Sequence, residues 1–580
     1  MVKFKGMRKL LKYLRHYRAQ SVLAPLFKLL EAGFELFVPL VVSAIIDNAV
    51  NGAAGWHYVV YACLILVGLG VVGLICAVAA QYFAARAAVG FSQELRHDLF
   101  DKMQSLSYSE IDTIGTSKMI TRMTSDVNQI QSGVNLVLRL FMRSPFIVFG
   151  AMLMAFLIDK TSGGIFAGSI AVLCVVVFGI MLASIPLYKK VQGKLEKVTT
   201  STRETLTGAR VLRAFCKEED EIQKYNRRNE ELTKSQKFVG KISALMNPLT
   251  YSVINAAIIL LLYVGAVKVD GGTLSQGNVI ALYNYMSQIL VELIKLANLI
   301  ITVTKSFACA GRVNEILDMH AEKGAEIIAE KKENLPFISF NNVCVNYAGA
   351  GMDALSDISF TVEKGQTVGI IGGTGAGKTT LVNMIPHFYD VKSGEVLVDG
   401  ENVNSVGDEK LRDMCGIVPQ RAVLFKGSIR ENMQWGNKTA DDGEIMSAVT
   451  AAQAADVINS KENGLDELVE QGGKNFSGGQ RQRLTIARAL VRKPEILILD
   501  DSASALDYAT DANLRKSLKE LEYKPTVFIV SQRTSSIRHA DKIIVLDGGK
   551  TVGIGTHEQL LKSCEVYREI HYSQYAKEEA

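Results

Sequence analysis

The sequence lacks the patterns that mark several common classes of protein. Its eight cysteines stand singly and none forms a CxxC pair, so neither a cysteine metal site nor a dithiol redox site is indicated. Several of them lie in apolar runs, which favours buried, reduced thiols. The net charge is only +5 over 580 residues, and this balance gives no support to a nucleic-acid partner.

A cleavable signal is also missing from the N-terminal residues. Residues 1–18 carry lysines and arginines spaced among Leu10, Leu11 and Leu14 rather than one continuous apolar core. This pattern predicts a basic amphipathic helix, an elbow that lies on the cytoplasmic surface of a membrane.

Long apolar stretches dominate the first half of the chain. Each supplies the ~20 residues needed to cross ~30 Å of hydrocarbon, and the six stretches occupy residues 19–47, 57–84, 133–158, 163–187, 243–268 and 278–307. The connections 86–122 and 189–241 are rich in Lys and Arg, whereas residues 47–58 contain neither. By the positive-inside rule, these two connections and both termini are cytoplasmic. The sequence therefore predicts a multi-pass membrane protein with an all-α transmembrane domain over residues 19–312. Because no signal or transit segment is indicated, a plasma (inner) membrane is the simplest placement.

Proline is scarce in the segments that join these stretches. None occurs between Pro39 and Pro145 or between Pro186 and Pro248. A helix over about 58–106 would be roughly 70 Å long, about twice the thickness of a bilayer. The surplus predicts long cytosolic stalks, which end at short turns near Gly115 and Gly208.

A few charged residues interrupt the apolar stretches. Glu31 and Glu35 lie on the first stretch, and Glu292 and Lys295 lie on the last. Such residues are functional candidates at membrane depth, and the two glutamates hint at a cationic amphiphile as substrate. The interpretation we favour is local neutralisation on packed faces, by Lys28 with Glu31 and by Lys295 with Glu292. Arg139 and Arg143 are expected near lipid headgroups, with no special role.

The composition changes after Arg312. Residues 313–336 form a polar stretch that is typical of a linker, and short β-rich runs begin at Phe337. The apolar run 367–371 then leads into a GxxxxGK[ST] loop and a helix, which predicts a phosphate-binding P-loop. Its backbone N–H groups would face one anion. The residues expected to bind nucleotide are Gly372, Gly373, Thr374, Gly375, Ala376, Gly377, Lys378, Thr379 and Thr380.

Within this loop, Lys378 would neutralise the β- and γ-phosphates, and the Thr379 hydroxyl would hold Mg²⁺. Residues 495–500 predict a buried strand that ends in Asp500, placed to reach the same Mg²⁺ through water. A Ser-Gly-Gly turn at 477–479 begins an Arg-rich helix and is a second phosphate-binding device. Two such devices in one chain suggest that each serves a different nucleotide.

On these motifs the chain resembles the six-helix ABC exporters of the multidrug, lipid and peptide superfamily, over essentially its whole length. The resemblance implies a six-helix membrane domain followed by an α/β P-loop ABC ATPase domain at 337–580, with ATP and Mg²⁺ as cofactors. It implies coupling loops near 106–126 and 203–225. The residue roles it implies are the Walker A loop 372–380, the adenine-stacking Tyr347, the Q-loop Gln420 that reaches Mg²⁺, the Walker B Asp500, the signature residues Ser477, Gly478, Gly479 and Gln480, and the D-loop Asp507.

Two residues depart from the family pattern. Asp501 follows Asp500 where the family has the general base Glu, and Gln532 stands in place of the switch histidine. Asp is one methylene shorter than Glu, and misplacement by about 1 Å can cost ~10²-fold in rate. Gln hydrogen-bonds a phosphate but carries no positive charge. We therefore expect a weakly hydrolytic site.

In this family two ATPase domains pair head to tail, and each ATP lies between the Walker motifs of one domain and the signature of the other. A near-complete signature, with Phe476 where Leu is usual, beside an altered catalytic pair favours a heterodimer. Its partner would supply the catalytic Glu and switch His. The expected activity is ATP-driven export of a hydrophobic or amphiphilic substrate (drug, lipid or peptide) by alternating access. The alternatives are a homodimeric lipid flippase and an ATP-gated channel or regulator on the same fold.

Overall fold

The computed structural model describes residues 2–50, 55–319, 335–347 and 349–575, which fall into two compact units. The first unit comprises residues 1–104 and 117–319, and the second comprises residues 105–116 together with 320–580. Each unit is described by itself below. The short segment 105–116 lies between membrane-unit residues in sequence but packs with the second unit.

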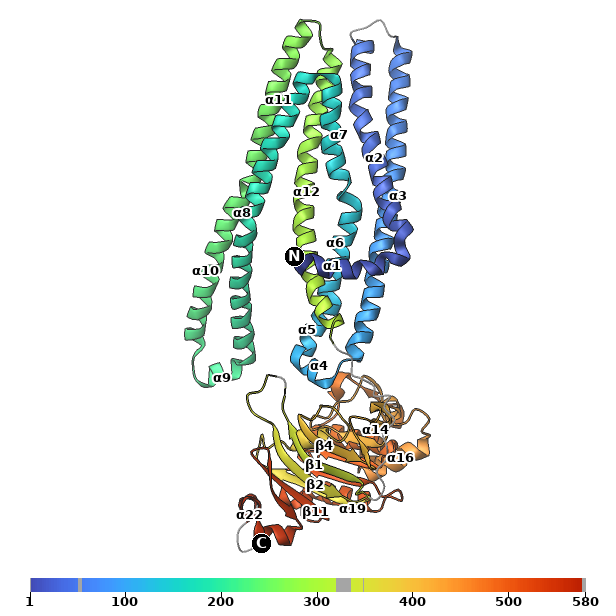
Figure 1. The fold of residues 1–580 in the computed structure, drawn as a ribbon, viewed down its shortest axis with the longest axis vertical. Helices are drawn as coiled ribbons and strands as arrows, with labels where there is room; N and C mark the ends of the chain where they lie inside the picture. The colour runs from blue at the N-terminus through green and yellow to red at the C-terminus, as the bar shows by residue number, and fades with distance from the viewer. Residues whose placement is uncertain (1, 51–54, 320–334, 348, 576–580) are drawn as a thin grey trace. The chain divides into compact units, whose positions relative to one another are not determined.

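Helices make up the membrane unit (Figure 1). Their bounds are α1 Val2–Leu10, η1 Leu11–Tyr17, α2 Arg18–Ile45, η2 Ile46–Val50, α3 Trp56–Gln104, α5 Thr116–Thr121, η3 Arg122–Asp126, α6 Val127–Leu140, α7 Arg143–Ile158, α8 Lys160–Thr207, α9 Ala209–Ala214, α10 Glu218–Ala244, α11 Met246–Asp270 and α12 Gln276–Leu317. α2 packs along α3, α8 packs along α10 and α11, and α12 packs against α2, α6 and α7.

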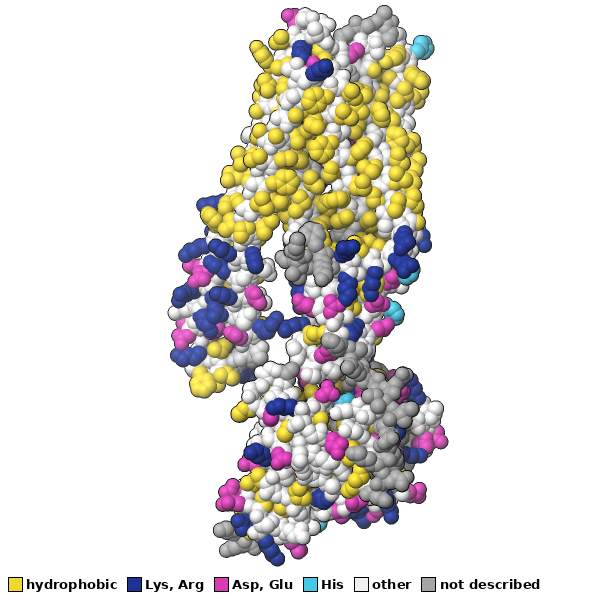
Figure 2. Space-filling model, viewed as in Figure 1, with side chains coloured by type: hydrophobic (Ala, Val, Ile, Leu, Met, Phe, Trp, Pro, Cys, Tyr) yellow, Lys and Arg dark blue, Asp and Glu magenta, His cyan; other side chains and the backbone are white. Residues whose placement is uncertain are grey.

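Six helical runs among the described residues are long and apolar enough to cross a membrane, which confirms the number predicted. They are Gly6–Asn48, Trp56–Gln104, Thr116–Ile158, Lys160–Thr207, Glu218–Asp270 and Gln276–Leu317. The 49 residues of α3 make a helix of about 74 Å at ~1.5 Å per residue. On the face shown in Figure 2, apolar side chains form a band over these helices, and charged side chains gather on α10 and the adjoining part of α8.

The N-terminal segment is helical, but it is not the single helix expected over 1–18. A 3-10 turn, η1, separates α1 from α2. The phenol of Tyr13 is buried and donates to Asp98 of α3 at 2.7 Å, and its ring meets Phe91 edge-on. These contacts tie η1 to α3, so tertiary packing sets the local geometry here.

The last membrane helix is longer than the sequence predicts. α12 continues to Leu317, so the first residues of the expected linker 313–336 are helical. Val313 and Ile316 are buried, and their packing explains why the helix does not end at Arg312. Residues 320–334 of that linker lie outside the described part of the chain.

The prediction for Arg143 is wrong. This side chain is buried rather than placed among headgroups, with only 8% of it exposed. Its guanidinium contacts Glu292 at 2.5 Å and Glu35 at 2.7 Å. The two expected local pairs are confirmed, with Lys28–Glu31 at 2.5 Å and Lys295–Glu292 at 2.8 Å.

The second unit is built on two main sheets. An antiparallel sheet has the order β2-β1-β4-β5, and a larger sheet has the order β12-β11-β3-β10-β9-β6, parallel except for β12. A two-stranded pair, β7-β8, completes the set in the described residues. The bounds are β1 Ile338–Val345, β2 Leu355–Val362, β3 Thr367–Gly372, β4 Ser393–Val398, β5 Glu401–Asn402, β6 Cys415–Val418, β7 Gly427–Ser428, β8 Leu468–Val469, β9 Ile496–Asp500, β10 Thr526–Val530, β11 Lys542–Asp547 and β12 Lys550–Gly555.

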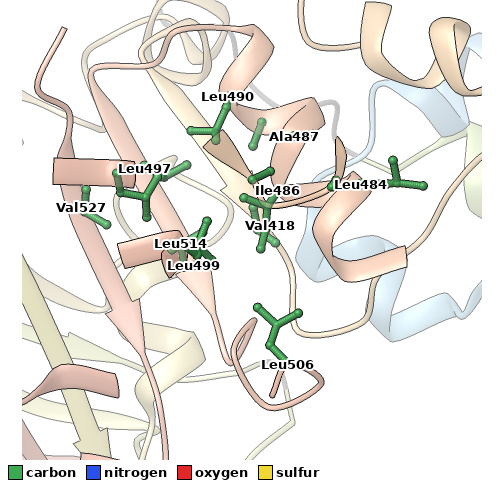
Figure 3. Packing of buried hydrophobic residues seen from close by; sticks show 14 of the residues in the cluster. Val418, Leu484, Ile486, Ala487, Leu490, Leu497, Leu499, Leu506, Leu514 and Val527 are labelled. Carbon is green, nitrogen blue, oxygen red and sulfur yellow. The ribbon is translucent and has the colours of Figure 1, made fainter. Parts of the chain in front are cut away.

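Short helices surround these sheets. They are α4 Tyr108–Ile114, α13 Lys378–Asn383, α14 Asp408–Asp413, α15 Ile429–Gln434, α16 Asp442–Ala451, α17 Ala455–Asn459, η4 Gly464–Asp466, η5 Gln471–Gly473, α18 Gly478–Val491, α19 Tyr508–Lys519, α20 Thr534–Ile537, α21 His557–Ser563 and α22 Glu565–Tyr572. In the core, Ile486 of α18 lies beside Val418 of β6 (Figure 3). Each fully buried aliphatic side chain of this kind contributes about 1.5–3 kcal/mol, so α18 is firmly held against the sheet.

The helix α4, from the segment 105–116, packs on the loop that follows α13. The Tyr108 ring stacks on Phe388 with centroids 4.2 Å apart, and the Tyr389 hydroxyl donates to Asp112 at 2.7 Å. α4 ends at Gly115, whose φ of +80° is a conformation that favours glycine. The predicted turn near Gly115 therefore serves as the end of a helix that belongs structurally to the second unit.

Candidate nucleotide site

The register of the parallel sheet brings the predicted site together. Val530 of β10 pairs with Ile370 of β3 on one side and with Asp500 of β9 on the other. The carboxyl ends of all three strands therefore meet at one edge, where ligands bind in open α/β sheets. The P-loop follows β3, Asp501 follows β9 and Gln532 follows β10.

The P-loop has the backbone geometry that its glycines predict. Gly375 and Gly377 have φ values of +82° and +91°, in the left-handed region. A Cβ at Gly377 would come within 2.7 Å of the Leu355 side chain and 2.8 Å of the Ala354 carbonyl oxygen. Space and backbone conformation both require glycine there, and α13 begins at the next residue, Lys378.

Lys378 lies folded over this loop. Its ammonium donates to the carbonyl oxygens of Gly372 at 2.9 Å and Gly373 at 2.7 Å. Partial burial lowers the pKa of Lys378, and the nearby charges of Asp501 and Asp500 oppose that shift. An anionic phosphate beside the ammonium would favour its charged form.

Thr379 and Asp500 form the oxygen-rich side of the site. The Thr379 hydroxyl donates to the Asp500 carboxylate at 2.9 and 3.1 Å. Burial raises the pKa of Asp500, the charge of Asp501 adds to the rise, and Thr379 and Lys378 oppose it. A hydroxyl and one carboxylate, completed by phosphate oxygens and water, form the type of ligand set that Mg²⁺ takes in nucleotide sites. The donor chemistry of these residues therefore fits the expected ion.

Asp501 begins the segment where the family has its general base. Its backbone N–H donates to Val530 at 3.0 Å, and its φ of +47° lies in the left-handed region. Gln420, after β6, approaches it, with Nε2 3.4 Å from an Asp501 carboxylate oxygen. The structure thus places four side chains in one group, the Lys378 group: Lys378, Gln420, Asp500 and Asp501.

Gln532 is exposed, and the described contacts give its side chain no hydrogen bond to that group. Its backbone is held by a residue that the sequence did not point to. Gln574, just after α22, donates to the Gln532 carbonyl at 2.7 Å and accepts from the Thr534 N–H at 2.9 Å. Gln574 therefore holds the segment 532–534 in place, and no sequence signal marked it because its partners are about 40 residues away.

Tyr347 lies at the edge of the site. Its hydroxyl is 2.9 Å from the Thr380 hydroxyl, and its ring meets Tyr389 edge-on with centroids 5.1 Å apart. Tyr347 is therefore next to the start of α13, and stacking on adenine stays a prediction.

The predicted signature forms a helix start of its own. Ser477 caps α18 in a reciprocal capping box with Gln480, and Phe476 before it is buried. A Cβ at Gly479 would come within 3.1 Å of the Ala505 carbonyl, so glycine allows a close approach there. Asp507 caps α19 by accepting from the Thr510 N–H at 2.8 Å, and this hydrogen bond lowers its pKa. Among the described residues, no hydrogen bond joins the signature to the Lys378 group.

Comparison with known proteins agrees with this arrangement. Residues 21–293 match the family model of the ABC transporter transmembrane region, and residues 355–504 match the ABC transporter model. An uncharacterized ABC transporter ATP-binding protein of Mycobacterium tuberculosis is 34% identical over 575 residues, 97% of each chain. The chain belongs to the ABC transporter family. This confirms the predicted fold, a six-helix membrane domain followed by an α/β ABC ATPase domain.

Other relatives extend the comparison. An ABC transporter ATP-binding protein of Bacillus subtilis is 32% identical and matches over 99% of each chain. An ATP-dependent lipid A-core flippase of Syntrophus aciditrophicus is 31% identical over 497 residues, 84% of this chain and 80% of the flippase. A solved bacterial Atm1-family ABC exporter with ATP bound shares the fold, with a TM-score of 0.80 over 97% of this chain and 24% identity. This ABC transporter thus has an ATPase domain that couples ATP hydrolysis to transport, and it has the fold of an ABC exporter.

Proposed function

We propose that this chain is the weakly hydrolytic half of a heterodimeric exporter, which moves a hydrophobic or amphiphilic substrate by alternating access. Its partner would be an ABC half-transporter with a complete catalytic Glu and switch His. The proposal places the protein in the plasma (inner) membrane, with the termini and the ATPase domain in the cytoplasm. The Lys and Arg content of 86–122 and 189–241 supports that orientation.

The residues that would hold nucleotide are those of the Lys378 group and its loop. Lys378 and the P-loop N–H groups would bind the phosphates, and Tyr347 would support the adenine. Thr379, Gln420 and Asp500 would hold Mg²⁺, whose charge neutralises the phosphate oxygens when it is bound. The partner's nucleotide would meet Ser477–Gln480, whose capping box orients the N–H groups at the start of α18.

The observation that carries the proposal is the catalytic pair Asp501 and Gln532. Asp501 sits directly after the Walker B Asp500, but its carboxylate is one methylene shorter than the family's Glu. A base about 1 Å short of the attacking water loses roughly 10²-fold in rate. Gln532 adds no positive charge near the γ-phosphate. Nucleotide would therefore be retained at this site and hydrolysed chiefly at the site built from the partner's Walker motifs.

In this scheme nucleotide closes the two ATPase domains, and the long helices transmit the closure to the membrane domains. The transmembrane cavity would then open outward, and hydrolysis at the competent site would reset it. The docking of α4 on the loop that holds Phe388 and Tyr389 supports such a coupling, because that loop directly follows the P-loop helix α13.

The test is ATP turnover by this chain purified alone in lipid nanodiscs. We expect little turnover, and we expect Asp501→Glu combined with Gln532→His to raise it roughly 10- to 100-fold. Lys550→His, on exposed β12, is a control that adds a histidine away from the site. Brisk turnover by the unmodified chain would mean a working homodimer and would overturn the heterodimer proposal.

A homodimeric lipid flippase is the second candidate. The similarity to proteins named lipid A-core flippases favours it, at 31% identity over most of this chain. Brisk turnover by the unmodified chain, together with ATP-dependent translocation of a labelled lipid, would support this candidate. ATP-gated ion conductance without such translocation would instead support a channel or regulator.

A further inference from the structure

A half-open cavity of about 420 Å³, with polar and apolar lining residues, lies in the membrane unit between α2, α7 and α12. Apolar side chains from all three helices form part of its lining. Its polar lining comes from Glu35 on α2 and from Asn284, Ser287, Gln288, Glu292 and Lys295 on α12. The α12 residues recur at helical three- and four-residue spacing, so they form one polar stripe along a membrane-spanning helix.

The ion pairs around this cavity balance one another. Arg143 contacts Glu292 at 2.5 Å and Glu35 at 2.7 Å, and Lys295 contacts Glu292 at 2.8 Å. Each carboxylate thus has a cationic partner, and each cation a carboxylate. Glu35, Glu292 and Lys295 line the cavity, and Arg143 lies behind the lining; together these four groups carry no net charge.

Exposure separates these four groups into two kinds. The side chains of Arg143 and Glu292 are 8% and 4% exposed, and Ser144 donates to Glu292 at 2.8 Å. These buried groups hold the helices together. Glu35 and Lys295 are 40% and 42% exposed and line the cavity. The exposed charged groups that a ligand meets are therefore one carboxylate, Glu35, and one ammonium, Lys295.

A further group in the lining has no partner. The Oε1 atom of Gln288 is buried and accepts no hydrogen bond from any described residue. A buried acceptor left without a donor destabilises the folded state. A donor group on a ligand in the cavity would satisfy it.

We propose that this cavity binds the head group of a zwitterionic amphiphile, with the cationic end at Glu35 and the anionic end at Lys295. The inference rests on the proposed export function, whose substrate class it specifies. A ligand with net charge would leave that charge uncompensated in a low-dielectric site, whereas a zwitterion keeps the site neutral and aligns with both exposed groups. The earlier hint of a cationic amphiphile is narrowed to a zwitterion, because Lys295 lines the cavity together with Glu35 and offers a partner for an anionic end.

The test measures binding to the full-length chain in nanodiscs, which does not require turnover. One probe series is a hydrophobic dipeptide with free termini, its cationic C-terminal amide and its anionic N-acetyl form. A second series is a short-chain phospholipid with a zwitterionic, an anionic or a cationic head group. We expect the zwitterion in at least one series to bind roughly tenfold more tightly than either charged form. Preference in the lipid series alone identifies a lipid head group, and preference in the dipeptide series alone identifies a soluble zwitterion.

Two substitutions locate the ends of the ligand. Glu35→Gln should make the zwitterion bind no better than the anionic form, and Lys295→Gln should make it bind no better than the cationic form. Glu94→Gln is the matched control, because Glu94 on α3 pairs with His16 and does not line the cavity, so head-group preference should persist. The double variant Glu35→Lys with Lys295→Glu keeps the site neutral and should retain zwitterion binding, with thermal unfolding of each variant verifying that it is folded.

Equal binding of all head groups by the unmodified chain would overturn the inference, as would folded Glu35 and Lys295 variants with unchanged preference. A different outcome would contradict the export proposal. Selective binding without ATP-dependent uptake of the same probe into proteoliposomes, even with the Asp501→Glu and Gln532→His changes, would sink export while leaving the binding site in place.

Discussion

The residues expected to bind nucleotide and the residues expected to hydrolyse it differ in how closely they match the family pattern. Lys378, Thr379 and Asp500 form a connected group with the P-loop, and their donor chemistry fits phosphate and Mg²⁺. Asp501 and Gln532, at the positions where we propose the catalytic pair, carry a shorter and an uncharged side chain. In the proposed function, holding a nucleotide and hydrolysing it depend on separable residues, so one function can be altered while the other stays complete.

The largest change is expected when nucleotide binding itself is removed. Lys378→Ala should weaken nucleotide binding roughly 100-fold, about 2.7 kcal/mol, because the ammonium that would face the phosphates is lost. Titration with a fluorescent ATP analogue measures the effect. Lys392→Ala is the control, since Lys392 pairs with Asp353 at 2.8 Å on the surface. Near-normal binding by Lys378→Ala would show that the P-loop backbone alone holds the nucleotide.

A role of Ser477 in the nucleotide site can be distinguished from its role as a helix cap, because a second serine of this chain caps a helix in the same way. Ser477 and Ser428 both cap helices through complete capping boxes, so replacing either by Ala should cost a similar ~1 kcal/mol in stability. In the chain carrying Asp501→Glu and Gln532→His, Ser477→Ala should lower ATP turnover roughly tenfold and Ser428→Ala less than twofold. Equal losses would mean that Ser477 acts only as a cap.

A smaller effect is expected on the pH dependence of stability, at His387 in the loop on which α4 packs. Hydrogen bonds to Asp390 and Asp408 raise the pKa of His387 above its ordinary value near 6.5, against the effect of burial. Because the folded state binds this proton more tightly, the stabilisation is complete below pH ~6.5 and is lost as pH rises through the folded-state pKa. His387→Asn should lower the unfolding temperature by a few degrees at pH 6 and by less at pH 8.5.

Thermal unfolding of the full chain at both pH values measures this difference. The matched control is His97→Asn, because the His97 side chain is 76% exposed. An equal loss for His387→Asn at the two pH values would contradict the proposed proton linkage.

Local patterns predicted much of this molecule. The six apolar spans, the P-loop and the strand that ends at Asp500 are each coded by consecutive residues, so their periodicity and glycine spacing suffice. The long α3 followed from the absence of proline. The pairs Lys28–Glu31 and Lys295–Glu292 are three residues apart on one helix, and that spacing predicted them correctly.

What the sequence did not predict depends on distant contacts. Arg143 looked like an interfacial residue because its partners Glu35 and Glu292 are 108 and 149 residues away. Gln574 lies in a C-terminal segment without any motif, and only the fold brings it to Gln532. The extension of α12 to Leu317 reflects burial that the polar local sequence does not reveal.

The packing of α4 also has a consequence for how the chain is made. Asp112 and Tyr389 are 277 residues apart, so at about 5–20 residues per second the ribosome needs roughly 14–55 s to supply the partner of a helix already synthesised. Throughout that interval Tyr108 has no aromatic ring to stack on. Conversely, an ATPase fragment begun at residue 337 would lack α4 and leave Phe388 and Tyr389 uncovered. Such a fragment would be prone to self-association, because α4, which packs on these rings in the full chain, lies more than 200 residues upstream of residue 337.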